Sequence, residues 1–152
     1  MNENTMKIHH IGIIVNNIQD SLGEFSKFVK FDETTIPTLV GSQKVNVCFM
    51  KIGELRIEFI EPVGNESPVR KALEKGGGFN HICFEVDNLS ETINEIVKKG
   101  GRLIVSPVEG FEGKQIAFVL LNMKKTNLNL VELVEIKNDW KHECWNRYHW
   151  CK

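Results

Sequence analysis

Hydrophobic and polar positions along the chain follow two spacings, which predict strands and helices in a recurring order. Runs rich in β-branched and aromatic residues, bounded by turn-forming residues, predict strands. The predicted strands cover residues 8–15, 44–50, 55–61, 79–86, 115–121 and 128–135, with shorter ones near 33–39 and 102–106. Apolar residues spaced three and four apart predict helices beginning at Ile18 and Leu89, where Asn17 and Asn88 supply capping side chains. Ser67-Pro68 is expected to open a short helix that ends near Gly76.

The chain contains an internal repeat. The segment that starts at His10 matches the segment that starts at His81, 71 residues later, with His, Ile, Val and Asn at corresponding places. A second match pairs residues 57–61 with residues 131–135, 74 residues later. Because the two matches occur in the same order with nearly the same offset, we interpret the chain as a duplicated module.

Each module is read as βαβββ, which predicts an α+β fold. A four-stranded sheet with one helix leaves its other face bare, so the two modules are expected to form one curled mixed sheet around a common cleft. The expected segments form one domain and are an N-terminal tail (1–6), the first module (7–62), a linker helix (63–78), the second module (79–136) and a C-terminal tail (137–152).

Composition narrows the function classes. The 152 residues carry 19 Lys and Arg against 20 Asp and Glu, a formal charge of −1, so neither a nucleic acid nor a membrane is an expected partner. No apolar run is long enough to span a bilayer, and the polar N-terminus lacks the pattern of a secretory signal. The four cysteines are therefore read as reduced thiols of a cytoplasmic protein.

The repeated polar positions are the candidate chemistry. They are His10 and Glu58 in the first module and His81 and Glu132 in the second. Strand alternation puts Glu132 on an otherwise apolar face, where a carboxylate is costly unless it is paired or bound to a metal. A single strand histidine is more often structural, but four ligand-type residues at repeated positions favour a metal site. The expected cofactor is one divalent ion: Zn²⁺, Ni²⁺, Co²⁺, Mn²⁺ or Fe²⁺.

Neighbouring polar residues are expected to lie outside this site. They are His9, Glu61, Glu85 and Glu135, which alternation directs to the other sheet face or to the rim. In the tail, Trp140, Cys144, Tyr148 and Cys151 fit one face of a packing helix. The alternative, a zinc site that uses His142-x-Cys144 and His149-x-Cys151, matches no zinc module spacing.

Four stretches of sequence resemble the vicinal oxygen chelate superfamily, above all methylmalonyl-CoA epimerases and bacterial glyoxalase-like proteins. They are residues 9–15, 56–78, 79–88 and 113–118, and the likeness covers residues 7–136. The resemblance implies paired βαβββ modules around a divalent metal, with ligands at His10, Glu58, His81 and Glu132. The segment at residues 43–47 departs from the epimerase pattern, because it holds no carboxylate that could act as a base on the opposite face.

The predicted function is that of a metal-dependent isomerase that removes a proton next to a metal-bound carbonyl. The resemblance favours a methylmalonyl-CoA epimerase-like reaction on a thioester. Glu132 is the candidate base and Glu58 its counterpart; in the alternative, both carboxylates are permanent ligands and a bound water or hydroxide is the base. The alternatives are a glyoxalase I-type lactoylglutathione lyase, a metal-dependent tailoring enzyme, and a small-molecule-binding or resistance protein of the same fold. We expect a homodimer.

Overall fold

The computed structural model describes residues 6–126, 128–136 and 150–151. The helices are α1 (Ile18–Phe25), α2 (Arg70–Glu74) and α3 (Leu89–Lys98). The strands are β1 (Lys7–Ile14), β2 (Glu33–Thr35), β3 (Thr38–Val40), β4 (Val45–Ile52), β5 (Leu55–Pro62), β6 (Gly78–Val86), β7 (Arg102–Glu109), β8 (Gln115–Leu120), β9 (Leu130–Glu135) and β10 (Trp150–Cys151). Within the described ranges, no helix has both the length and the apolar character needed to cross a membrane.

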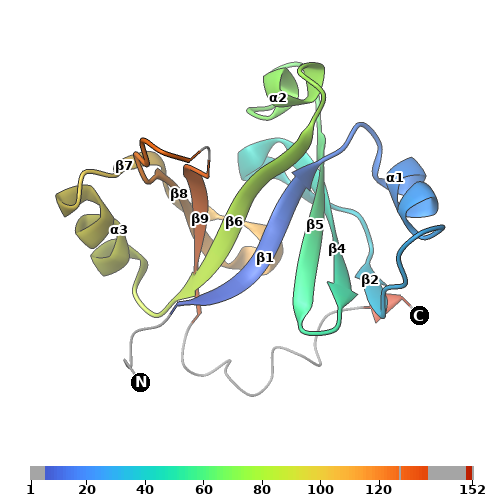
Figure 1. Ribbon diagram of the computed structural model, residues 1–152, viewed down its shortest axis with the longest axis horizontal. Helices are drawn as coiled ribbons and strands as arrows, with labels where there is room; N and C mark the ends of the chain where they lie inside the picture. Colours follow the sequence, from blue (N-terminus) through green and yellow to red (C-terminus); the bar gives the residue numbers. More distant parts are fainter. Residues whose placement is uncertain (1–5, 127, 137–149, 152) are drawn as a thin grey trace.

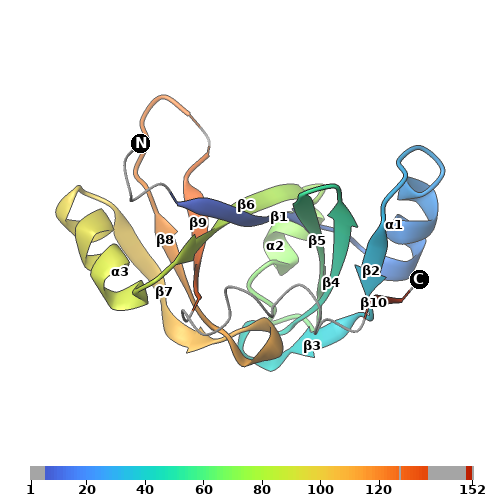
Figure 2. The ribbon, with the colours of Figure 1, turned by 90° about the horizontal axis from the view of Figure 1, so that it is seen from below.

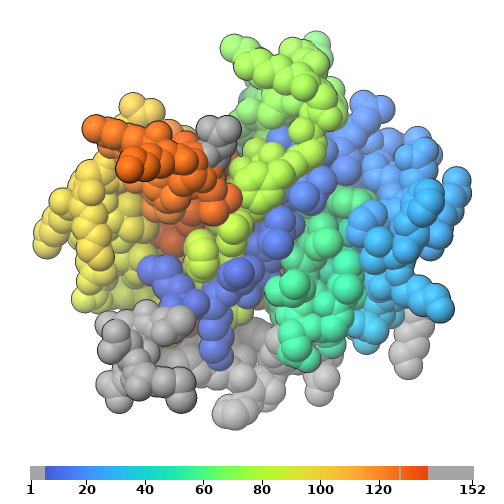
Figure 3. Space-filling view, viewed as in Figure 1, coloured from blue at the N-terminus to red at the C-terminus, as the bar shows by residue number. Residues whose placement is uncertain are grey.

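The strands form one mixed sheet built from two equivalent halves. Its order is β10-β2-β4-β5-β1-β6-β9-β8-β7, with β3 also paired to β4. In the first half β1 runs parallel to β5, and in the second half β6 runs parallel to β9. The halves meet where β1 pairs antiparallel with β6, and these two strands cross the middle of the molecule side by side (Figures 1 and 3). The repeat in the sequence is thus a repeat in the topology.

The sheet is curled, and the two longer helices pack against its outer face at opposite ends (Figure 2). Ile18 of α1 packs with Met50 and Phe59 in one core cluster, while Leu89 and Ile93 of α3 belong to another. Full burial of one such side chain contributes about 1.5–3 kcal/mol. Because the helices use the outer face, the concave inner face is left for the site. The curled mixed sheet expected from the repeat is confirmed.

The helix starts follow the predicted capping. Asn17 accepts a hydrogen bond from the backbone N–H of Asp20 at 2.9 Å, and Asn88 accepts one from Glu91 at 3.0 Å. Helix α2 differs from the prediction, since it begins at Arg70 rather than at Ser67-Pro68. The N–H of Arg70 bonds the carbonyl of Ser67, so the segment from Ser67 to Arg70 forms a turn that leads into the helix.

The prediction for the C-terminal tail can be compared with the structure only at its last residues. Residues 137–149 lie outside the described residues, and with them most of the predicted packing helix and of the alternative zinc site. Cys151 is the described residue of that pattern, and it belongs to the strand β10, which pairs antiparallel with β2. The helix predicted for this position is therefore wrong at Cys151.

Candidate metal centre

Four buried side chains meet at the centre of the concave face. His10, Glu58, His81 and Glu132 each offer one ligand atom, and these atoms all lie within 4.8 Å of one another. None of the four side chains belongs to a residue more than 6% exposed. The structure therefore brings together the same four residues that the repeat singles out, and we call them the quartet.

The strand register explains why these residues meet. His10 lies on β1 and His81 on β6, the two central strands. Glu58 on β5 is paired with Gly12, two residues after His10, and Glu132 on β9 is paired with the residue two after His81. Alternate residues of a strand share a face, so each module delivers one imidazole and one carboxylate to the same side of the sheet.

The spacing of the donor atoms fits a single small cation. The Nε2 atom of His10 lies 3.0 Å from that of His81, 3.2 Å from Glu58 Oε2 and 3.1 Å from Glu132 Oε2. The Nε2 atom of His81 lies 2.8 Å from Glu132 Oε2 and 3.6 Å from Glu58 Oε2. Neighbouring ligands around an ion with bonds of about 2.1 Å lie about 3.0–3.4 Å apart.

The hydrogen bond between Asn80 and His81 also supports a cation site. Asn80 Oδ1 lies 2.7 Å from His81 Nδ1 and can only accept, so the His81 ring donates from Nδ1. The other ring nitrogen, Nε2, faces the carboxylate oxygen of Glu132 at 2.8 Å. A cation bound between these two buried atoms would satisfy both of them. The donor set thus fits a divalent metal ion.

Close contacts in the quartet shift the pKa values of Glu132 and His10. Burial raises the pKa of Glu132, but His10 and His81 more than offset this and hold it well below its usual range. Burial lowers the pKa of His10, but Cys83, Glu58 and Glu132 raise it by more, so that the pKa lies well above its usual value. Glu132 is therefore a carboxylate, and negative charge dominates around the two imidazoles.

A cavity of about 230 Å³ opens above the quartet. Its walls are largely apolar, and two phenylalanines pack edge-on against the ligand histidines, Phe49 on His10 and Phe118 on His81. Among the described residues that line the cavity, the only carboxylates are Glu58 and Glu132, and the only lysine or arginine is Lys114. Near the segment at residues 43–47, the residue with a polar side chain on this wall is Gln43.

Sequence reasoning missed Gly12, which the close packing of His81 requires. A Cβ atom at residue 12 would overlap the imidazole of His81, its partner in the β1–β6 pair. A glycine in the interior of a predicted strand is a known sign of such an approach. Gly12→Ala is therefore expected to displace the His81 ring and to weaken metal binding. Metal content of the purified variant measures this, with Gly23→Ala, where a Cβ meets nothing within 4 Å, as the control.

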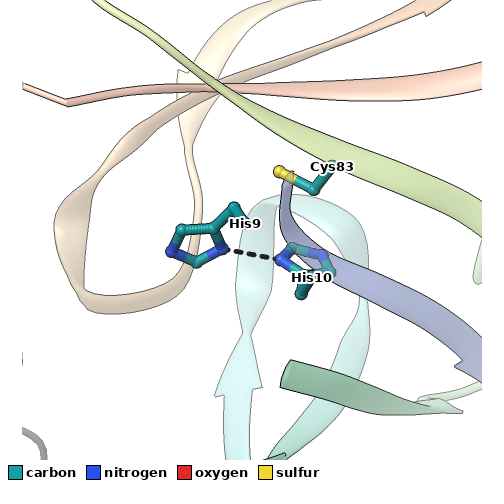
Figure 4. Close-up of side chains that lie close together, drawn as sticks. All are labelled: His9, His10 and Cys83. Carbon is teal, nitrogen blue, oxygen red and sulfur yellow. Dashed lines mark hydrogen bonds between the residues drawn. The ribbon is translucent and has the colours of Figure 1, made fainter. Parts of the chain in front are cut away.

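Of the two positions expected for His9, the other sheet face is wrong, because His9 lines the cavity. In the pairing of β1 with β6, the step from Ile8 to His10 is matched by a single step on β6, so a bulge falls at His9. The bulge breaks the alternation, and both His9 and His10 face the cavity. Figure 4 shows the two rings joined at Nδ1, 2.8 Å apart, with Cys83 beside them.

His9, His10 and Cys83 are a second group whose ligand atoms lie within 4.8 Å of one another. Burial, followed by the charge of Glu132, raises the pKa of the Cys83 thiol to about 12. A thiol ligates metals as the thiolate, so this pKa disfavours Cys83 as a ligand. The quartet is the better metal site.

The other residues expected outside the site are in neither group. Glu61 accepts a hydrogen bond from the N–H of Ile18 at 2.8 Å, and Glu135 accepts one from Leu89 at 3.0 Å. Both carboxylates thus lie on the helix side of the sheet, at the first residues of α1 and α3. Glu85 is half-buried and belongs to neither ligand group.

The chain is similar in sequence and in fold to several known proteins. Residues 9–118 match the family described as the Glyoxalase/Bleomycin resistance protein/Dioxygenase superfamily. The uncharacterized protein YqjC of Bacillus subtilis is 38% identical over 90% of this chain and 97% of its own length. The mitochondrial methylmalonyl-CoA epimerase of Dictyostelium discoideum is 32% identical over 85% of this chain and 78% of its own. A Streptomyces coelicolor methylmalonyl-CoA epimerase variant, solved with 2-nitronate-propionyl-CoA, is 26% identical over 87% of this chain and 95% of its own, with a TM-score of 0.75.

Proposed function

The chain belongs to the glyoxalase/bleomycin resistance protein/dioxygenase superfamily, and from this membership and the quartet we propose that it is a metal-dependent epimerase of methylmalonyl-CoA or a similar 2-carboxyacyl thioester. It is related to methylmalonyl-CoA epimerases, which are enzymes. The observation that carries the proposal is the pair of carboxylates, one from each module, at the base of an apolar cavity beside two imidazoles.

The quartet is the proposed holder of the cofactor. His10, Glu58, His81 and Glu132 would bind one divalent ion, with Zn²⁺, Ni²⁺, Co²⁺, Mn²⁺ and Fe²⁺ as candidates. Such an ion is a Lewis acid, which polarises a carbonyl and so acidifies the neighbouring C–H bond.

The two carboxylates would move the proton. Glu132 is ionised, as a general base must be, and it would accept the α-proton of the thioester at a carboxylate oxygen. Inversion needs a proton delivered to the opposite face of the planar carbon. Glu58 comes from the other module and is the only further carboxylate among the described cavity residues, so it is the proposed counterpart. Glu58 would take a proton from solvent and deliver it to the opposite face, and Glu132 would release the α-proton to solvent, so the number of protons is unchanged.

The walls of the cavity suit an acyl thioester with a carboxylate. Apolar side chains such as Val47 and Ile60 exclude water, which strengthens the electrostatic interactions inside. Lys114 also lines the cavity, where its positive charge would attract the free carboxylate of a 2-carboxyacyl group. A relative solved in complex with methylmalonyl-CoA, 26% identical to this chain with a TM-score of 0.75, supports this substrate class.

Hydrogen exchange in D₂O tests the proposal. Metal-loaded protein is incubated with methylmalonyl-CoA and, separately, with the hemithioacetal of methylglyoxal and glutathione. We expect deuterium to enter the α position of the thioester, with inversion at that carbon, and both to stop when a chelator removes the metal. Mass spectrometry measures the exchange, and a coupled assay specific for one epimer measures the inversion.

The other outcomes identify other members of the superfamily. Formation of lactoylglutathione alone would replace the proposal with a glyoxalase I-type lyase. Exchange without inversion would show one working base and exclude an epimerase. Absence of exchange with both substrates would also contradict the proposal and would favour a tailoring enzyme or a small-molecule-binding protein of this fold.

A further inference from the structure

The cavity above the quartet reaches the surface at two residues. Among the described residues that line it, only Pro68 and Ile104 are exposed, and Ile104 is 45% exposed. Pro68 lies just before α2, and Ile104 lies on β7, the strand at the end of the sheet. A ligand of the quartet therefore extends out of the cavity past these two residues, and we call this opening the mouth.

Arg102 lies beside the mouth, on the cavity side of the sheet. Leu130, which lines the cavity, is paired with Leu120 of β8, and Leu120 is paired in turn with Arg102 of β7. Residues paired directly in antiparallel strands have their side chains on the same face. Arg102 is exposed and is two residues from Ile104, which is about 7 Å along a strand. Its guanidinium is thus close to any ligand that leaves the mouth along β7.

Four lysines lie in the segments next to Arg102. Two are at the end of α3, and two are in the loop between β8 and β9. The side-chain amide of Asn122 in this loop donates a hydrogen bond to the carbonyl of Gly100 at 3.4 Å, which joins the loop to the end of α3. In Figure 1 the loop and α3 lie on the same side of the molecule, away from α1. We call the five exposed cations the cationic rim: Lys98, Lys99, Arg102, Lys124 and Lys125.

The cationic rim is positive in a chain that is almost neutral as a whole. The formal charge of the chain is −1, yet residues 96–108 and 113–131 contain no Asp or Glu. The first module differs, because its segment 71 residues before 96–108 contains Asp32 and Glu33. A one-sided positive charge of this kind attracts anionic ligands and orients them.

We propose that the cationic rim binds the phosphates of a coenzyme A thioester whose acyl group lies over the quartet. In such a thioester an uncharged pantetheine arm joins the acyl group to a nucleotide that carries phosphates at its 3′ and 5′ positions. The arm would pass through the mouth, and the phosphates would reach the rim. Arg102 suits them, since a guanidinium donates two parallel hydrogen bonds to one phosphate. The position of the acyl group rests on the proposed function, whereas the affinity of the rim for phosphates does not.

Thioesters that differ only in their carrier test the proposal. Metal-loaded wild type is offered methylmalonyl-CoA, methylmalonyl-4′-phosphopantetheine and methylmalonyl-pantetheine, and exchange of the α-proton gives kcat/KM for each. Exposed ion pairs contribute up to about fivefold each, so loss of all phosphates is expected to lower kcat/KM about 10- to 100-fold. Equal values for all three carriers would overturn the proposal. Equal values for the first two alone would overturn binding of the nucleotide and favour a carrier protein, whose arm has a single phosphate.

The triple variant Lys98→Gln/Lys99→Gln/Arg102→Gln locates the effect. Its kcat/KM with methylmalonyl-CoA is expected to fall about 10- to 100-fold, while its value with methylmalonyl-pantetheine stays that of wild type. Lys27→Gln is the matched control, because Lys27 is exposed just after α1 and lies 71 residues before Lys98. An equal loss on both carriers would overturn the proposal, since the substitutions would then act on the site or the fold rather than on the phosphates.

Binding to the metal-free protein separates the rim from the proposed function. Calorimetric titration with propionyl-CoA and propionyl-pantetheine needs neither a metal nor a reaction. Wild type is expected to bind propionyl-CoA at least about tenfold more tightly, and this preference is expected to shrink in the triple variant and at high salt. If it does so but no thioester exchanges its α-proton, the proposed function fails and the rim stands. Equal affinity for the two propionyl thioesters would overturn the rim, even in a working epimerase.

Discussion

Purified protein offered divalent metals is expected to bind one ion per chain, and His81→Ala is expected to lose that ion. His81 is 2% exposed, and its Nε2 atom lies within 3.6 Å of ligand atoms of the three other quartet residues. Removing it leaves two carboxylates and one imidazole, and the affinity of such a set falls with each donor lost. Plasma mass spectrometry of the desalted protein measures the stoichiometry.

Thermal unfolding provides a second measurement of the same prediction. An ion present at about 100 times its dissociation constant stabilises the folded chain by about 2.7 kcal/mol, provided that it binds only the folded state. Wild type should therefore gain stability on metal addition, and His81→Ala should not. Glu61→Gln is the matched control, because this carboxylate lies on the helix side of the sheet at the start of α1. A wild-type protein that stays empty after exposure to all five candidate metals would end the metalloenzyme interpretation.

The quartet could be located from the sequence because two independent regularities coincide at it. The repeat selects pairs of equivalent residues, and strand alternation then separates Glu58 from Glu61, which accepts the N–H of Ile18 on the other face. Helix caps are local signals as well, since Asn17 bonds a residue only three positions away. Features encoded within one short segment, or repeated in two, were therefore predictable.

Other features depend on how distant segments pair. The bulge at His9 is defined only by the register of β1 against β6, some 70 residues away in the chain, so alternation along β1 alone gives the wrong face. The contact of Arg56 with His9 and the overlap that a Cβ at Gly12 would make with His81 also join separate strands. The residues that support the site were therefore less visible in the sequence than the ligands themselves.

Glu132→Gln is expected to slow exchange of the α-proton strongly, while Glu58→Gln is expected to preserve exchange and to lose inversion. An amide keeps an oxygen for the metal but cannot take up the proton, so each variant removes a base without removing the donor atom. General base catalysis contributes about 10²- to 10⁴-fold, and the exchange rate of Glu132→Gln should fall by this factor. Metal content is measured for both variants, so that rates are compared per loaded site.

The two substitutions are expected to have different effects because the two carboxylates come from different modules. Glu132 Oε2 lies 2.8 Å from His81 Nε2, and Glu58 Oε2 lies 3.6 Å from the same atom, so Glu58 is less closely held by the second module. If Glu132 takes the proton from one face, deuterium still enters from solvent through Glu132 when Glu58 is an amide, but it returns to the same face. Exchange at the wild-type rate in metal-loaded Glu132→Gln would show that the base lies elsewhere. Inversion at the wild-type rate in Glu58→Gln would show that the second proton comes from a group other than this carboxylate, with Gln43 and the solvent of the cavity next to be examined.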